Sequence, residues 1–310
     1  MAKEPKHYNV VILGAGPAGL TSAIYTARAG LSTLVIDESS AGGQVKTTHQ
    51  VANYPGFIDP IPGYQLAQNM KDQASKYGAE FNLVSDVTKI TLDGKVKYFE
   101  IDGSETITSD YVIIATGRSP RILHLPGELE YKGQGISYCA TCDGEFYKDK
   151  EVFVIGGGNS AIQESFLLLK HVKKLTIVHQ FDELQAEKIA AQKIMSHPKV
   201  EFYWSHEPRS FEKNGDRVVV EVENLKTKEF FKLERDGVFI FVGMIPNSSI
   251  FKDKGLNLNK YGYIPTDDLM ETNLDDVYAV GDIRDKKTWQ ITVAVGEGTI
   301  AALEIVKKTA

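Results

Sequence analysis

Two cysteines three positions apart are the residues best able to do chemistry in this sequence. Cys139 and Cys142 are the only cysteines in the 310 residues, and Asp143 directly follows the second. Two sulfurs at this spacing can close a disulfide, and they suffice for a complete exchange cycle, in which one thiolate attacks a partner disulfide and the other resolves it. At a helix start, backbone amides favour the thiolate of the first cysteine. The pair therefore predicts redox catalysis, with Asp143 as the candidate acid.

A zinc site is the main alternative for the cysteines. Structural zinc takes four ligands, usually two close Cys pairs or one Cys pair with a spaced His pair. The nearest downstream histidines, His171 and His179, supply no such pair, so we expect no metal. Asp143 has a second interpretation, as a helix N-cap or first-turn acid, and both roles could hold.

Composition and charge limit the classes of function. The chain is 42% hydrophobic, enough for a sizeable core and, we expect, two domains. A formal net charge of -6 and a pI near 5.7 argue against a nucleic-acid partner. The apolar run at residues 10–13 is too short for a signal peptide or membrane span. We therefore expect a cytoplasmic protein without membrane association, whose close cysteines serve catalysis rather than act as a structural staple.

Residues 8–37 predict an element able to position a cofactor. They read as a strand, the pattern Gly14-x-Gly16-x-x-Gly19, a helix and a second strand that ends at Asp37. In such a βαβ unit the glycines permit a tight turn and close approach of a pyrophosphate, and the terminal acid binds ribose hydroxyls. A plain glycine-rich turn is the alternative, but strand, helix and acid are all present.

Residues 151–180 repeat this pattern, with Gly156-x-Gly158-x-x-Ala161 between two predicted strands. Alanine in the last place is an accepted variant. Two units predict two dinucleotides, as a flavoprotein reduced by a nicotinamide requires. The alternative for the second unit is a scaffold whose glycines only pack a turn.

Two more strand ends support a flavin at the first unit. Residues 110–117 end a strand in Ala-Thr-Gly, and residues 275–283 end another in Gly281-Asp282, where Asp282 could accept ribityl hydroxyls. A helical pattern follows from about Thr292, and its N-terminus could face the flavin pyrimidine edge. The fold class we predict is α/β, with two Rossmann-like dinucleotide-binding domains. The nicotinamide domain (121–247) is inserted into a discontinuous FAD domain (1–120 and 248–310).

The motifs GAGPAG, AGGQV, NYPG, ATG, CATCD, GGGNSA and AVGDI occur in the order and spacing typical of low-molecular-weight thioredoxin reductases, and the resemblance spans nearly the whole chain. It implies a homodimeric FAD enzyme that reduces the disulfide of thioredoxin. It also implies that Cys142 receives electrons from the flavin, Cys139 attacks thioredoxin and Asp143 donates a proton. Rotation of one domain against the other between half-reactions is a further implication.

The motifs and the resemblance together predict the cofactor-binding residues. For FAD these are Gly14, Gly16, Pro17, Ala18, Gly19, Asp37, Gly42, Gly43, Gln44, Asn53, Val87, Ala115, Thr116, Gly117, Gly281, Asp282, Gln290 and Ile291. For the nicotinamide dinucleotide they are Gly156, Gly158, Asn159, Ser160, Ala161, His179 and Gln180. Residues 42–44 could also be a surface turn. Trp289 departs from the family, which commonly has arginine there.

The sequence also departs from the family where the reductant binds. Members that use NADPH carry HRRxxxR after the second strand of the nicotinamide unit, whereas residues 179–185 read HQFDELQ. Gln180, Phe181 and Gln185 thus replace all three arginines. No bidentate, permanently charged partner for a 2′-phosphate remains at these positions.

A standard NADH anchor is missing too, because His179 occupies the place that Asp37 holds in the first unit. His179 or Gln180 could still bind neutral ribose hydroxyls, while Asp182 or Glu183 would repel a phosphate. NADH is therefore favoured over NADPH. Weak NADPH use, a donor such as reduced ferredoxin, and a flavin-bearing redox sensor with little turnover stay open.

Overall fold

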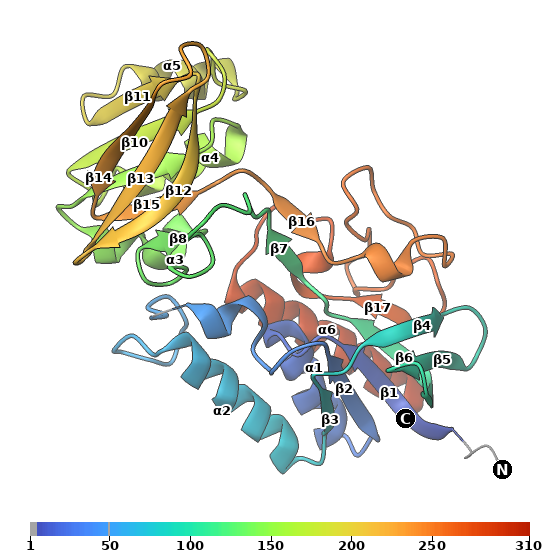
Figure 1. Ribbon diagram of the computed structural model, residues 1–310. Coiled ribbons are helices and arrows are strands. Elements are labelled where there is room, and N and C mark those ends of the chain that lie inside the picture. Colours follow the sequence, from blue (N-terminus) through green and yellow to red (C-terminus); the bar gives the residue numbers. More distant parts are fainter. Residues whose placement is uncertain (1–4, 49) are drawn as a thin grey trace. The chain divides into compact units, whose positions relative to one another are not determined.

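The computed structural model describes residues 5–48 and 50–310, which form two compact units (Figure 1). The first unit holds the described residues up to Thr47, together with Tyr54–Ser119 and Ile245–Ala310. The second holds Pro120–Met244 and, apart from residue 49, Thr48–Asn53. The second unit is therefore largely an insertion within the sequence of the first.

The first unit is built on a sheet with helices beside it. Its strands are β1 (Lys6–Leu13), β2 (Thr33–Asp37), β3 (Glu80–Leu83), β4 (Val87–Thr91), β5 (Lys97–Ile101), β6 (Glu105–Ile114) and β17 (Val277–Ala279). Its helices are α1 (Pro17–Arg28), η1 (Gly43–Thr47), α2 (Gly63–Lys76), η3 (Ser249–Phe251), η4 (Gly281–Ile283) and α6 (Ile291–Thr309). Two short strands that pair with each other, β7 (Arg118–Pro120) and β16 (Met244–Pro246), lie where the chain leaves and re-enters this unit.

Strands β3, β2, β1 and β6 lie side by side in that order and run parallel. The second half of β6 also pairs in parallel with β17, so a strand from near the C-terminus completes the sheet. Helices α1 and α6 pack closely beside it, and a Cβ on Gly298 would lie 2.4 Å from the Ala18 carbonyl oxygen (Figure 1). The C-terminal segment is therefore part of the first unit.

The second unit contains two sheets. Its strands are β8 (Ile136–Ser137), β9 (Glu151–Ile155), β10 (Lys174–His179), β11 (Val200–Trp204), β12 (His206–Asn214), β13 (Arg217–Asn224), β14 (Phe230–Arg235) and β15 (Gly237–Ile240). Its helices are α3 (Ala140–Asp143), η2 (Gly144–Tyr147), α4 (Asn159–Leu168) and α5 (Lys188–Met195).

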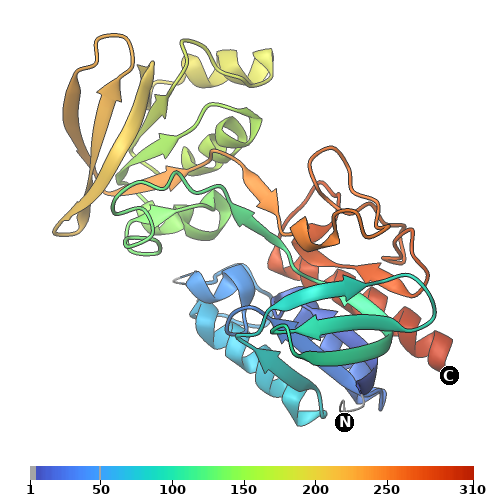
Figure 2. The same cartoon turned by 45° about the vertical axis from the view of Figure 1, so that its right-hand side comes forward.

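The parallel sheet of the second unit has the order β11-β10-β9-β15-β8, and the antiparallel sheet β12-β13-β14 packs on one of its faces (Figure 2). Phe153 and Val178 of the parallel sheet share a hydrophobic core with Val220 of β13. Val154 points the other way, because neighbouring strand residues alternate, and lies in a core with Ile162 of α4. Burial on both faces explains why these strands read as continuous apolar runs.

Both units share one arrangement of strands. In the orders β3-β2-β1-β6 and β11-β10-β9-β15, the strand before the glycine turn (β1 or β9) lies between the next strand of the chain (β2 or β10) and a later one (β6 or β15), as in dinucleotide-binding α/β folds. The predicted α/β class with two Rossmann-like domains is confirmed. The repeat predicted from the glycine patterns is thus a repeat of topology.

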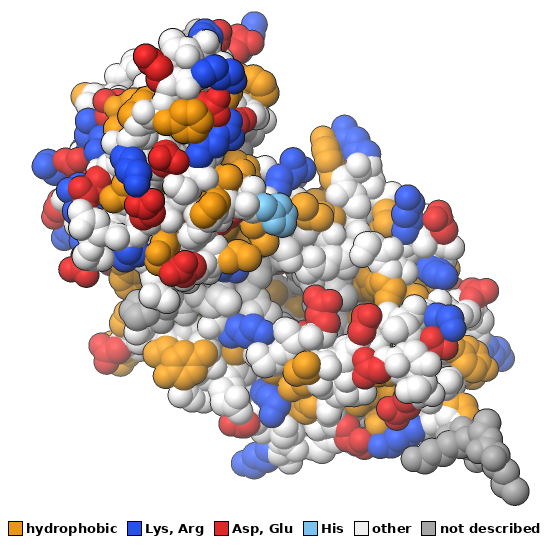
Figure 3. Space-filling view, in the orientation of Figure 1, with side chains coloured by type: hydrophobic (Ala, Val, Ile, Leu, Met, Phe, Trp, Pro, Cys, Tyr) orange, Lys and Arg blue, Asp and Glu red, His pale blue; other side chains and the backbone are white. Residues whose placement is uncertain are grey.

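The surface carries mixed charge. On the face shown in Figure 3, Lys and Arg side chains are interspersed with Asp and Glu. Large exposed apolar side chains include Ile58 and Tyr64 in the first unit and Ile189 in the second. Within the described part of the chain, no helix combines the length and apolar character needed to cross a bilayer.

Candidate active site

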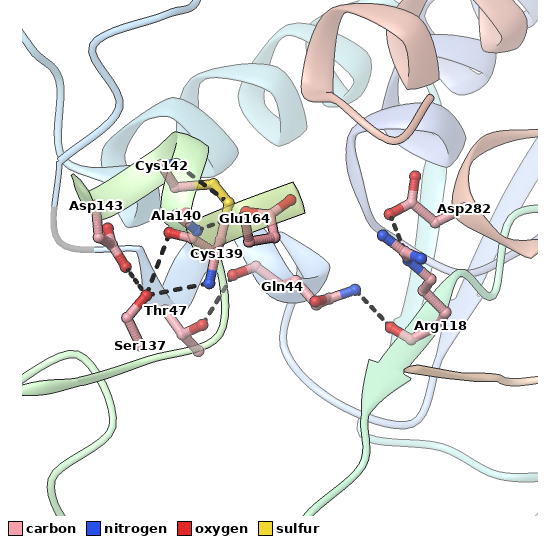
Figure 4. Close-up of a disulfide and its surroundings, with 10 residues drawn as sticks. All are labelled: Gln44, Thr47, Arg118, Ser137, Cys139, Ala140, Cys142, Asp143, Glu164 and Asp282. Atoms are coloured by element: carbon pink, nitrogen blue, oxygen red, sulfur yellow. Dashed lines mark hydrogen bonds and ion pairs between the residues drawn. A yellow bond between two sulfur atoms is a disulfide. The ribbon is translucent and has the colours of Figure 1, made fainter. Parts of the chain in front are cut away.

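The two cysteines form a disulfide at the start of α3 (Figure 4). Their Cα atoms are 5.3 Å apart, and Cys139 is the N-cap of the helix. The amide N–H of Cys142 donates a hydrogen bond to Sγ of Cys139 at 3.2 Å. After reduction the same bond would stabilise a thiolate on Cys139. The local geometry therefore favours Cys139 as the attacking nucleophile.

Asp143 is held by a serine that sequence analysis missed. The buried Ser137 hydroxyl donates to Oδ2 of Asp143 at 2.5 Å and accepts the amide N–H of Cys139 at 3.1 Å (Figure 4). One hydroxyl thus links the candidate acid to the backbone of a redox cysteine. The available signal was weak, since a serine two residues before a cysteine has many ordinary roles.

Two further polar groups lie near the pair. Oε2 of Glu164 accepts the amide N–H of Ala140 at 3.1 Å, in the first turn of α3. Burial, with smaller contributions from the charges of Asp143 and Asp236, raises the pKa of Tyr147 to about 12. The Tyr147 phenol therefore stays protonated at neutral pH.

The first unit brings most of the predicted FAD-binding residues to one edge of its sheet, where β1, β2, β6 and β17 end. Gly14 has a φ of 107°, and a Cβ there would lie 2.3 Å from the Ala115 carbonyl oxygen, so only glycine fits this turn. Oδ2 of Asp37 accepts the amide N–H of Ala15 at 2.7 Å. The Ala15 carbonyl oxygen accepts the N–H of Gly42, also at 2.7 Å.

Arg118, which no sequence motif indicates, joins the other side of this edge (Figure 4). The Gln44 side chain donates to the Arg118 carbonyl oxygen at 2.5 Å, and Nε of Arg118 lies 3.5 Å from Oδ2 of Asp282. The Arg118 guanidinium stacks over the Trp289 ring, 4.2 Å from its centroid. Burial raises the pKa of Asp282, although the charges of Lys286 and Arg118 oppose the shift.

Glu297 of α6 holds the backbone that follows β17, at the same edge of the sheet. Its buried carboxylate accepts the N–H of Gly281 at 2.7 Å. It also pairs with Arg284 at 2.7 Å and with Lys286 at 3.1 Å. The helix therefore fixes the loop that carries Asp282.

These residues fit a flavin dinucleotide. A Cβ built on Gly16, the N-cap of α1, would have only the Gly43 Cα within 4 Å, at 3.9 Å, which leaves room for a pyrophosphate. Nε1 of Trp289 is buried with no hydrogen-bond partner among the described residues. Pro17, Ala18 and Gly19 form the first turn of α1, Thr116 and Gly117 follow β6, and Gln290 and Ile291 begin α6. Asn53 belongs to the second unit and Val87 begins β4. Their flavin contacts stay predictions.

In the second unit the glycine turn after β9 has the same construction. Gly156 has a φ of 129°, and a Cβ there would lie 2.4 Å from the Phe241 carbonyl oxygen, just after β15. Gly158 is the N-cap of α4, and Asn159, Ser160 and Ala161 form its first turn. In both units the glycine turn, which follows β1 or β9, lies against the end of a neighbouring strand, β6 or β15.

His179 ends β10 and is only 5% exposed. Its ring packs on Gly157, where an added Cβ would lie 2.6 Å from the imidazole, and its Nε2–H donates to the Glu183 carbonyl oxygen at 3.1 Å. Burial lowers the pKa of His179, so the ring is neutral at pH 7. It presents no positive charge to a phosphate. Gln180 is exposed beside it.

Comparison with known proteins identifies the family of this chain. The model of the pyridine nucleotide-disulphide oxidoreductase family matches residues 8–298. The chain belongs to this family. It is an oxidoreductase of the flavin-dependent disulfide type.

Relatives within the family extend over nearly the whole chain. The thioredoxin reductase of Peptoclostridium acidaminophilum is 42% identical over 97% of this chain and 96% of its own. A 34.2 kDa protein in the rubredoxin operon of Clostridium pasteurianum is 43% identical, covering 97% of each chain. The crystal structure of thioredoxin reductase from Streptococcus pyogenes MGAS5005 has a TM-score of 0.92 at 38% identity, covering 99% of this chain and 100% of that one. The resemblance inferred from the motifs is confirmed.

Proposed function

We propose that this protein reduces the disulfide of thioredoxin, taking electrons from NADH through bound FAD and the Cys139–Cys142 pair. The observation that carries the proposal is the disulfide at the N-terminus of α3, with Asp143 held beside it by Ser137. Two glycine turns that fit dinucleotides support it. So do full-length relatives named thioredoxin reductase.

The sulfur chemistry balances without a further reagent. In the reduced protein the Cys139 thiolate attacks one thioredoxin sulfur, a mixed disulfide forms and the thioredoxin disulfide breaks. Asp143 gives a proton to the departing sulfur. The Cys142 thiol then attacks the Cys139 sulfur and gives its proton to the second departing sulfur, which releases dithiol thioredoxin and restores the Cys139–Cys142 disulfide. FAD, when bound and reduced by NADH, would supply the two electrons that reopen this disulfide.

We assign FAD to residues 1–120 and 248–310 and the nicotinamide to residues 121–247. The amides of the turn at Gly14 would bind the pyrophosphate, Asp37 the adenosine ribose and Asp282 the ribityl hydroxyls. The turn at Gly156 and the first turn of α4 would bind the pyrophosphate of the nicotinamide dinucleotide. Because the protein resembles thioredoxin reductases, we further propose that it is a homodimer and that it is cytoplasmic. Sedimentation velocity tests the dimer.

NADH is the preferred donor because the segment after β10 offers a 2′-phosphate little attraction. Gln180, Phe181 and Gln185 carry no charge, and burial keeps His179 neutral. The carboxylates of Asp182 and Glu183 stand nearby and would oppose a phosphate.

A second candidate is the same flavin and dithiol chemistry supplied by a donor such as reduced ferredoxin. One observation favours it: the segment after β10 is hydrogen-bonded onto the glycine turn. The amide of Gln185 donates to the Gly157 carbonyl oxygen at 2.9 Å, and the amide of Glu187 donates to Oδ1 of Asn159 at 2.7 Å. A dinucleotide has to fit alongside these contacts.

Thioredoxin reduction by the purified flavoprotein, followed with each nicotinamide, tests the donor. We expect kcat/KM with NADH to exceed that with NADPH by about tenfold or more, because the 2′-phosphate loses its charged partners. A clear preference for NADPH would contradict the proposal. Anaerobic flavin bleaching by reduced ferredoxin, with none by either nicotinamide, would support the second candidate.

A further inference from the structure

A cavity of about 550 Å³ opens in the second unit beside the glycine turn. Residues 180–183 and 185 line it together with Ser205, Leu225 and Lys226. It lies just beyond the C-terminal end of β10, and the amide of Gln185 ties its wall to Gly157. Ligands of open α/β sheets bind in the crevice outside the carboxyl ends of the strands, and the end of the second strand is where the adenosine ribose is held. The cavity is widely open to solvent.

The lining of this cavity includes one cationic side chain, Lys226. Among the described residues of its lining, Lys226 carries the single positive charge, and Asp182 and Glu183 carry the negative charges. Nζ of Lys226 lies 2.7 Å from Oδ2 of Asp182. Oδ1 of Asp182 accepts a hydrogen bond from the Ser205 hydroxyl. Both Asp182 oxygens are thus occupied, and the bonds from Lys226 and Ser205 lower the pKa of Asp182, so the pair is ionised at neutral pH.

The sequence separation of this pair explains why no motif reveals it. Asp182 follows β10, whereas Lys226 lies in the turn between β13 and β14. The antiparallel sheet brings that turn to the cavity. A lysine at this position could bind a phosphate as a point charge, but Asp182 already neutralises it.

We propose that the Asp182–Lys226 pair is a specificity determinant that masks a phosphate site next to the adenosine ribose. A 2′-phosphate entering the cavity has to displace Asp182 from Lys226 and approach the Asp182 carboxylate. A neutral ribose hydroxyl meets neither obstacle. The inference deepens the proposed preference for NADH and rests on the second unit binding the adenosine end of that donor. NADPH is then excluded by the repulsive Asp182 carboxylate as well as by the missing arginines.

Binding of two small probes to the full-length flavoprotein tests this without turnover. Adenosine 2′,5′-bisphosphate and adenosine 5′-monophosphate differ only in the 2′-phosphate, and titration calorimetry gives both dissociation constants. Asp182→Asn keeps an oxygen for Ser205 but removes the charge that holds Lys226. We expect this variant to bind the bisphosphate about tenfold more tightly relative to the monophosphate than the wild type does. Both side chains are 65% exposed, so the gain should shrink as salt is raised.

Two further variants separate the ion pair from general charge. Asp182→Asn combined with Lys226→Met should lose the gain, because the released cation is gone. Glu183→Gln removes a neighbouring carboxylate of the same lining and should change the probe ratio much less. An unchanged ratio in Asp182→Asn, or an equal gain in Glu183→Gln, would overturn the proposal.

The outcomes also separate this inference from the proposed function. If the wild type binds the monophosphate but NADH does not bleach its flavin, the proposed donor fails, and a bisphosphate gain in Asp182→Asn still supports the masked site. If neither probe binds the wild type or any variant, the cavity is not an adenosine site and the inference is overturned.

Discussion

Three groups meet at the redox pair, and each acts through a specific atom. The Cys142 amide is bonded to the Cys139 sulfur, the Ser137 hydroxyl to the Asp143 carboxylate, and the Cys139 amide to the Ser137 oxygen. The Cys142 amide therefore stabilises negative charge on the Cys139 sulfur, while Ser137 fixes Asp143 in place next to Cys142. The Ser137 hydroxyl has one proton and can donate to only one acceptor at a time. Its bond to Asp143 is therefore strongest when Asp143 is a carboxylate.

Replacing Ser137 with alanine should slow thioredoxin reduction by about tenfold, since a charge-assisted hydrogen bond to the acid is lost. The carboxylate form of Asp143 also loses stabilisation, so the pH–rate profile should move to higher pH. Stopped-flow reduction of thioredoxin across pH measures both effects. Thr141→Ala removes an exposed hydroxyl from α3, close to Ser137 in the sequence, and is the matched control. A profile that keeps its position in Ser137→Ala would argue against this positioning role.

His179 makes stability depend on pH. Burial lowers its pKa in the folded protein, whereas the unfolded chain titrates near its ordinary value of about 6.5. As the pH falls below that value, the unfolded state binds a proton that the folded state does not, so the free energy of unfolding decreases. Urea unfolding between about pH 7.5 and 5.5 should show this decline, and His179→Gln should reduce its slope. An identical slope in the variant would contradict the assignment.

Helix α6 positions a loop that precedes it in the sequence. Glu297 lies one to two turns inside the helix and accepts the N–H of Gly281, while its charge is balanced by Arg284 and Lys286. The arrangement fixes Asp282 and the helix N-terminus as one assembly at the end of β17. A buried carboxylate with two cationic partners is tolerated only because the pairing is complete.

Glu297→Gln should therefore lower the free energy of unfolding by about 3 kcal/mol, because Arg284 and Lys286 lose their shared counter-charge in a buried site. It should also weaken FAD retention, measured by release of flavin fluorescence on dilution. The control is Glu304→Gln on the same helix, whose i,i+3 pair with Lys307 should be worth less than about 0.5 kcal/mol. Equal losses in the two variants would show that Glu297 has no special role.

The two units hold different parts of the proposed chemistry. Apart from Asn53, the residues predicted to bind FAD lie in the first unit, and the disulfide lies in the second. On the proposed path, electrons would therefore pass from the first unit to the second. The chain passes between the units near Ser119 and near Met244, and again at both ends of the segment Thr48–Asn53.

Changing Cys139 or Cys142 to serine tests this path in the whole molecule. NADH should still bleach the flavin at the wild-type rate, whereas thioredoxin reduction should fall to background because the sulfur pair is incomplete. Ferricyanide, which can take electrons from a flavin directly, is the control acceptor and should be reduced normally. A Cys142→Ser variant that reduces thioredoxin at full rate would exclude the proposed path.

Local patterns were enough to predict the α/β class, both glycine turns and the cysteine pair. The reason is physical: positions such as Gly14 and Gly156 need a positive φ and have no room for a Cβ, so the requirement is visible in the residue itself. The start of α6 was predicted at about Thr292 and lies at Ile291. Two cysteines at this spacing likewise carry their chemistry in a short stretch of chain.

Only the tertiary structure decided which side chains serve these sites. Arg118 meets Asp282, Glu297 meets Gly281 and Lys226 meets Asp182, and each pair joins segments that no sequence period connects. From sequence alone, polar residues at such positions are predicted to be ordinary surface residues, because their partners are distant in the sequence. A backbone constraint acts on the residue itself and so is visible in the local sequence. Charge pairing depends on which loops and strand ends the sheets place side by side.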